Sequence, residues 1–95
     1  MTNLRNEARG RDCQIRLPGI CCFDPETSVL AHLNGAGMGM KHNDIHAAIG
    51  CSQCHDVVDG RVKTEFSREY VELAHRQGVQ RTQQIWVDEG FIVVV

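Results

Sequence analysis

The chain has few aromatic residues and no long apolar segment. Three Phe, one Tyr and one Trp among 95 residues exclude a large aromatic core, so a bound metal would help to stabilise so small a domain. No stretch approaches the roughly 20 apolar residues of a membrane span, and residues 1–7 hold no apolar run of signal-peptide length. We therefore expect a cytoplasmic protein that does not bind a membrane.

Cysteine, in contrast, is abundant, with five residues in the chain. Without a recognisable export signal, this number favours reduced thiols that bind a metal over disulfides. The Cys51-x-x-Cys54 spacing lets two sulfurs meet one soft cation, and Cys13 and Cys21 would complete a tetrahedral structural zinc site. Cys22 is an alternative to Cys21, and cysteines 13, 21 and 22 could instead be small buried apolar residues.

The run from Cys51 to His55 also matches the attachment pattern of c-type haem. In that interpretation the second axial ligand would be one of Met38, Met40, His42 and His46. The lack of an export signal argues against haem, as does the absence of any role for Cys13 and Cys21. We therefore favour zinc.

The formal net charge of −2 argues against a general polyanion-binding protein. The charge is uneven, however, because the first 16 residues hold four arginines against two acids. A local basic face is therefore expected, and its candidate phosphate contacts are Arg5, Arg9 and Arg11.

The residue pattern predicts both helices and strands. We expect helices over residues 2–9, 43–49, 52–59, 67–78 and 79–89, and strands over residues 13–17 and 28–33. Ser52 and Ser67 are the expected N-caps of the helices that begin there. Residues 85–87 would also suit a strand, but residues 79–89 fit a helix better. Residues 34–40 hold three glycines and predict a loop. Residues 91–95 form a β-prone tail that needs a neighbouring strand.

Three further residues suggest chemistry on phosphodiesters. On a short helix His55 and Asp59 are four residues apart, so their side chains share one face and can hold a harder cation. His32 ends a predicted strand. Each residue alone has an ordinary structural explanation, but together they are suited to hydrolysis, in which one imidazole deprotonates water while a cation polarises the phosphate.

The order of several motifs resembles a group of small lambdoid phage and prophage proteins that are assigned as nucleases of the HNH, or His-Me finger, superfamily. The motifs are Ala8-Arg9-Gly10-Arg11-Asp12-Cys13, Arg16-Leu17-Pro18-Gly19-Ile20-Cys21, Pro25 to His32, Gly37 to Lys41, and Cys51 to Asp56. The resemblance covers residues 4–90.

The resemblance implies an α+β fold with a zinc-stabilised ββα-metal core and flanking helices. The core would span residues 11–60 of a single domain, 1–95, followed by a helical extension over 64–90. The strands would be those near Cys13 and Val29. His32 would be the general base and His55 with Asp59 would bind Mg²⁺ or another divalent cation for cleavage of DNA.

The sequence departs from the family pattern at two places. Ala31 stands where a metal ligand often precedes the base, so weaker cation binding is expected. The residue that orients the base could be Asn34, Asn43 or Asp44. These departures leave a second hypothesis, in which the chain is a catalytically inactive zinc-binding module that binds nucleic acid or protein.

Overall fold

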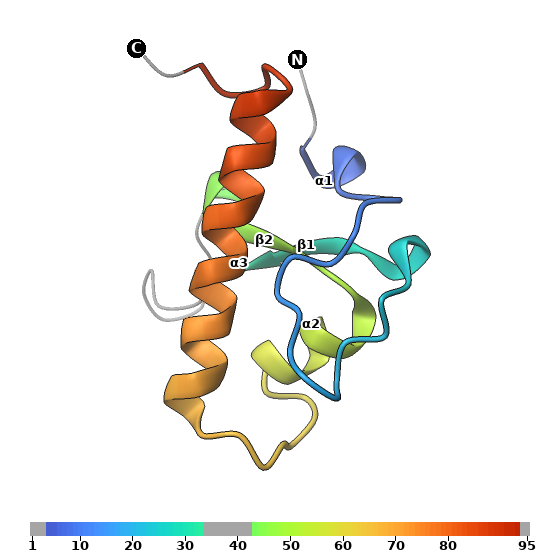
Figure 1. Cartoon of the computed structure of the whole chain (residues 1–95), viewed down its shortest axis with the longest axis vertical. Helices are drawn as coiled ribbons and strands as arrows, with labels where there is room; N and C mark the ends of the chain where they lie inside the picture. The colour runs from blue at the N-terminus through green and yellow to red at the C-terminus, as the bar shows by residue number, and fades with distance from the viewer. Residues whose placement is uncertain (1–3, 34–42, 94–95) are drawn as a thin grey trace.

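The computed structural model describes residues 4–33 and 43–93, and its architecture is α+β, as predicted (Figure 1). Its elements in chain order are helix α1 (Leu4–Glu7), the 3-10 turn η1 (Pro25–Thr27), strand β1 (Val29–His32), the 3-10 turn η2 (Asp44–His46), strand β2 (Ala47–Gly50), helix α2 (Ser52–Val58) and helix α3 (Arg68–Asp88). The predicted loop 34–40, together with Met38, Met40 and His42, lies outside the described residues.

The two strands form an antiparallel pair in which Val29 lies opposite Gly50 and His32 lies opposite Ala47. The strand predicted at 28–33 is confirmed. The helix predicted over 43–49 is wrong, because a 3-10 turn there leads into β2. Four small or branched residues are too few for a stable helix, whereas pairing with β1 satisfies their backbone groups.

The strand predicted over residues 13–17 is also wrong. Cys13, Gln14 and Ile15 are all buried, so the segment does not alternate between two faces, and Arg16 has a positive φ of 57° that interrupts an extended chain. The backbone N–H of Gln14 donates to the carbonyl of Ile49 at 2.7 Å, which ties the segment to β2 without making it a strand. The strand pair before α2 is therefore β1–β2.

Helix α3 is one continuous helix, where the sequence predicted two. Its N-terminal cap is the predicted one, because the Ser67 hydroxyl accepts a hydrogen bond from the Tyr70 N–H. Gly78 does not end the helix: it lies where α3 crosses β2, and a Cβ there would be 3.1 Å from the Cβ of Ala48. Glycine thus permits a close approach rather than a turn.

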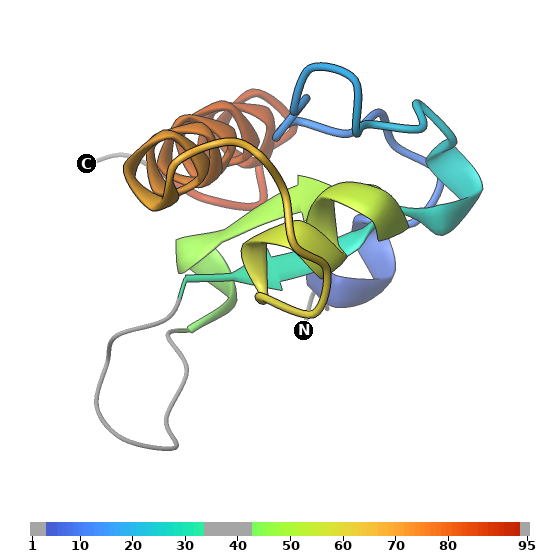
Figure 2. The same cartoon turned by 90° about the horizontal axis from the view of Figure 1, so that it is seen from below.

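The hairpin lies between α3 on one face and α1 on the other, while α2 packs beside it (Figure 2). Two groups of buried side chains result. The group next to α2 contains Cys13, Ile15, Leu17, Ala31, Ala48, Cys51, Cys54, Val57 and Val79. The other group contains Ala8, Leu30, Ala47, Ile49 and Trp86.

Beyond α3 the chain turns back, and the N–H groups of Phe91 and Ile92 both donate to the carbonyl of Trp86. The described part of the predicted β-prone tail, residues 91–93, is therefore not in a strand. None of the helices in the described ranges has the length and apolar character that a bilayer crossing requires.

Candidate functional site

Four cysteines from three parts of the chain meet beside α2. The sulfurs of Cys13, Cys21, Cys51 and Cys54 all lie within 4.8 Å of one another, and the Sγ atoms of Cys21 and Cys51 are 3.8 Å apart. Tetrahedral zinc with bonds of about 2.3 Å requires sulfurs about 3.8 Å apart. The predicted set of four thiols is therefore brought together at a spacing that fits zinc.

Local backbone structure delivers these sulfurs. Cys51 is the N-cap of α2, where its Sγ accepts from the Cys54 N–H at 3.4 Å, and so takes the place expected for Ser52. In the segment before η1, the N–H of Cys21 donates to the carbonyl of Leu17 at 2.9 Å, in a turn that includes Gly19 at φ 72°. This turn directs Cys21 back toward Cys13.

The thiols of the cluster differ in pKa. A hydrogen bond from the Cys54 thiol lowers the pKa of Cys13 to about 4, and the same contact raises the pKa of Cys54. Burial raises the pKa of Cys21 to about 12. Without a cation the packed sulfurs resist ionising together, so a bound zinc ion would supply the positive charge that four thiolates need.

Cys22 does not belong to the cluster. It is exposed, its Sγ lies 3.7 Å from the Thr27 hydroxyl, and a hydrogen bond from the Asp24 backbone is the main cause of its lowered pKa. Of the two alternatives that the sequence left open as the fourth zinc ligand, Cys21 is therefore the one in the cluster.

The predicted pair on α2 is formed. His55 Nε2 lies 3.0 Å from Asp59 Oδ2, and the Asp59 side chain is only 8% exposed. The same carboxylate oxygen accepts from Arg61 Nη2 at 3.2 Å. Asp59 is the C-cap of the helix, which puts its side chain one turn beyond His55 on the same face.

His32, at the end of β1, contacts a different carboxylate. Its Nε2 lies 2.6 Å from Asp44 Oδ1, and the histidine side chain is 10% exposed. Arg5 Nε also donates to Asp44 Oδ1 at 3.2 Å. Of the three residues considered as a partner of His32, Asp44 makes the contact, and Asn34 lies outside the described residues.

Sequence reasoning missed a further histidine, His75 of α3. It is buried, its Nε2 donates to the carbonyl of Ala31 at 2.7 Å, and it is close enough to His55 and Asp59 for their charges to affect its titration. Burial lowers the pKa of His75. Its spacing of four from both Val71 and Val79 is the sequence signal that would have placed it on the buried face.

The three predicted catalytic residues do not form one tight cluster. Within residues 4–33 and 43–93, the four cysteines are the only group of three or more His, Cys, Asp or Glu side chains with ligand atoms all within 4.8 Å. The site consists instead of two pairs, His32 with Asp44 and His55 with Asp59. His75 touches the backbone beside the first pair and lies near the second.

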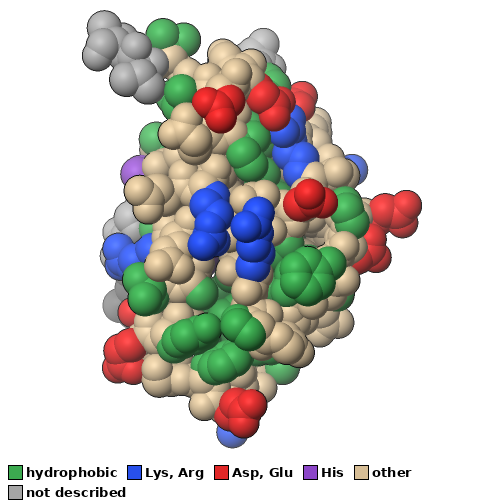
Figure 3. Space-filling view, viewed as in Figure 1, with side chains coloured by type: hydrophobic (Ala, Val, Ile, Leu, Met, Phe, Trp, Pro, Cys, Tyr) green, Lys and Arg blue, Asp and Glu red, His purple; other side chains and the backbone are tan. Residues whose placement is uncertain are grey.

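The arginines expected to contact phosphate have different environments. Arg9 is exposed, and Arg5 is bonded to Asp44. Arg11 binds Glu89 through both terminal nitrogens and lies 5.1 Å from the centre of the Trp86 ring, so it joins the N-terminal segment to the end of α3. Figure 3 shows Lys and Arg side chains next to one another near the middle of the face that it displays.

Comparison with known proteins identifies the family. The model of the family described as "Putative nuclease YbcO" matches residues 2–91. The chain belongs to this family. Proteins named "Putative nuclease YbcO" from Escherichia coli (strain K12) and "Putative nuclease ybcO" from Enterobacteria phage 82 are each 48% identical to it over 96 residues, covering 97% of this chain and 98% of theirs.

A solved structure has the same fold. The "Structure of a putative bacteriophage protein from Escherichia coli str. K-12 substr. MG1655" superposes with a TM-score of 0.80 at 44% identity, covering 93% of this chain and 100% of that one. The expected kinship with phage and prophage proteins is confirmed. The part matched by the YbcO family model includes all four clustered cysteines and both pairs of the site.

Proposed function

We propose that the protein is a metal-dependent nuclease of the ββα-metal (HNH, His-Me finger) type that hydrolyses phosphodiester bonds in DNA. The observation that carries the proposal is the order β1–β2–α2, with His32 at the end of the first strand and His55 beside Asp59 on the helix that follows the second. Membership of the YbcO nuclease family supports the same activity.

In this mechanism His32 is the general base. A carboxylate only accepts hydrogen bonds, so the contact with Asp44 makes Nε2 the protonated nitrogen of the neutral ring. Nδ1 then carries the lone pair that can remove a proton from the attacking water. Asp44 would hold the ring in this tautomer and stabilise the charge that develops on it, and Arg5 would keep Asp44 ionised.

His55 and Asp59 would hold the divalent cation. The carboxylate of Asp59 suits Mg²⁺ or Mn²⁺, and the imidazole of His55 suits a transition-metal ion. A bound cation would take over the charge that Arg61 now neutralises on Asp59. It would polarise the phosphate and stabilise the leaving oxygen. Because Ala31 offers no side-chain ligand, water and substrate oxygens would complete the coordination, and we expect weak binding of the free cation.

The zinc ion would be held by the four clustered cysteines and would have a structural role. It would fix the N-terminal segment to the start of α2, which bears His55 one residue after Cys54. Among the proposed phosphate contacts, Arg5 and Arg9 are more accessible than Arg11, whose guanidinium is bound to Glu89. We keep the cytoplasm as the proposed location.

The test is nicking of supercoiled plasmid DNA by zinc-loaded protein with and without Mg²⁺ or Mn²⁺. We expect cleavage that needs the divalent cation and that is lost in His32→Ala and in His55→Ala, while both variants keep their zinc and their circular dichroism spectrum. Gln80→Ala, at an exposed position of α3, serves as the control. Wild-type cleavage by His32→Ala would exclude the mechanism.

Ala31 and the net charge of −2 favour a second candidate, a zinc-stabilised module that binds nucleic acid or protein without cleaving it. This candidate predicts one zinc per chain and no nicking with any divalent cation. The comparison of wild type with His32→Ala distinguishes the binding module from a slow enzyme. A slow enzyme would lose its residual nicking in His32→Ala, whereas a trace contaminant would cleave equally in both preparations.

A further inference from the structure

A cavity of about 560 Å³ opens between the end of α2, the following loop and the first half of α3. We propose that it receives a single unstacked nucleotide of the substrate strand, next to the phosphodiester that is cut. This inference rests on the proposed nuclease function and adds a substrate class, DNA with unpaired nucleotides.

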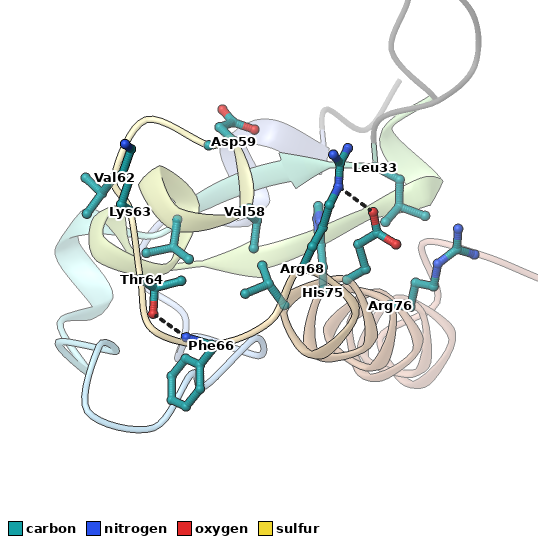
Figure 4. Close-up of a pocket in the computed structure, with 14 residues that line it drawn as sticks. Leu33, Val58, Asp59, Val62, Lys63, Thr64, Phe66, Arg68, His75 and Arg76 are labelled. Carbon is teal, nitrogen blue, oxygen red and sulfur yellow. Dashed lines mark hydrogen bonds and ion pairs between the residues drawn. The ribbon is translucent and has the colours of Figure 1, made fainter.

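The position of the cavity supports this occupant. Asp59, one of the two proposed cation ligands, lines its wall, and so does His75. Figure 4 shows Val58 and Asp59 on the α2 side and Arg68, His75 and Arg76 on the α3 side. A strand whose scissile phosphate lies next to Asp59, where the cation would be held, can therefore place the neighbouring nucleotide in this space.

The size and lining of the cavity suit a nucleobase. Small-molecule pockets typically measure about 300–1,000 Å³, so the space is adequate for a nucleotide. Leu33, Val57, Val58 and Val71 supply apolar wall, against which a base that has left its stack can be buried. A duplex with every base stacked offers no such group.

The polar side chains of the cavity suit the sugar-phosphate part. Lys63, Arg68 and Arg76 lie on its rim, opposed by Asp59 and by Glu72, which pairs with Arg68 at 3.3 Å. The three bases outnumber the two acids, so the rim is positive and complementary to phosphate, and a cation at Asp59 would add to this charge.

His75 provides a specific polar contact. Because its Nε2 donates to the Ala31 carbonyl, Nδ1 of the neutral ring is an acceptor. An acceptor in a partly apolar cavity can receive a hydrogen bond from the amino or imino group of a base. The cavity therefore combines an apolar wall, a positive rim and an acceptor, which are the components that bind a nucleotide.

The experiment measures binding without requiring chemistry. Fluorescence anisotropy of zinc-loaded protein, with no Mg²⁺ added, gives Kd for a labelled single-stranded octanucleotide and for the blunt duplex of the same sequence. Val71→Trp fills the cavity from α3, and Leu73→Trp, at an exposed position two residues along the same helix, is its matched control. Arg76→Gln removes one rim charge from an exposed position and is not expected to disturb folding.

We expect the single strand to bind about tenfold more tightly than the duplex, and Val71→Trp to remove about that preference while Leu73→Trp keeps it. Arg76→Gln should weaken binding of the single strand and reduce its salt dependence. Equal affinity for single strand and duplex, or a preference unchanged in both Val71→Trp and Arg76→Gln, overturns the inference. Should Val71→Trp fail to fold, Arg76→Gln decides.

The two proposals fail in different ways. If plasmid is nicked in a His32-dependent manner but the cavity variants bind normally, the nucleotide pocket is wrong and the nuclease stands. If the cavity variants lose single-strand binding but no divalent cation supports cleavage, the pocket stands as part of a binding module and the nuclease is wrong.

Discussion

Replacement of Gly78 tests how closely α3 approaches the hairpin. A Cβ at this position would lie 3.1 Å from three atoms, namely the Cβ of Ala48, the carbonyl oxygen of Gln14 and Cγ1 of Ile15. Alanine gains about 1 kcal/mol of helix propensity over glycine, but overpacking a fixed contact costs about 1–3 kcal/mol. We therefore expect Gly78→Ala to be neutral or destabilising by up to about 2 kcal/mol, despite its better helix propensity.

A larger side chain should make the effect unmistakable. Gly78→Leu adds three more carbons where the first already has no room, so we expect a loss of about 2 kcal/mol or more, which is about 8–16 °C in Tm for a domain of this size. Gln80→Leu, at an exposed position of the same helix, should stay within about 0.5 kcal/mol of wild type. Thermal unfolding followed by circular dichroism measures all three variants. A Gly78→Leu protein as stable as wild type would refute the close packing.

Two other predictions concern the metal and the partner of His32. Cys54→Ser should lose the one zinc per chain that elemental analysis is expected to find, whereas Cys22→Ser should keep it; equal zinc in both variants would contradict the assignment of the cluster. The hydrogen bond from His32 and the charge of Arg5 lower the pKa of Asp44 in the folded protein. The ionised carboxylate therefore stabilises the fold above the unfolded pKa of about 3.9, and this stability is lost as the pH falls through the lower folded pKa. Wild type should therefore resist urea better than Asp44→Asn at pH 6 and lose this advantage in stronger acid, and a constant difference down to pH 2 would contradict the contact.

Local sequence signals predicted those parts of the fold that local interactions determine. The Ser67 cap, the β1 strand, the short α2 helix and the two thiols of the Cys51-x-x-Cys54 knuckle all depend on residues close in sequence, and the structure has each of them. The assignment of Cys13 and Cys21 to the same cluster came from counting thiols and is also confirmed at the level of geometry.

The errors arose where distant residues decide the conformation. Ala47 and Ala48 favour helix by themselves, yet they pair with β1 and lie under α3. Gly78 reads as a helix stop unless the contact with Ala48 is known. His75 was missed, and Arg11 was assigned to phosphate, because their long-range partners, the Ala31 carbonyl and Glu89, could not be known from the sequence. Tertiary contacts override local propensity at each of these positions.

Chemical rescue tests the general-base role of His32 most directly. The measurement is the rate of Mg²⁺- or Mn²⁺-dependent plasmid nicking by zinc-loaded His32→Gly, with and without added imidazole, at pH values on both sides of the imidazole pKa. The proposed mechanism predicts no nicking by the variant alone and a saturable return of activity that increases as imidazole becomes neutral. Nicking by His32→Gly at the wild-type rate without imidazole would contradict it.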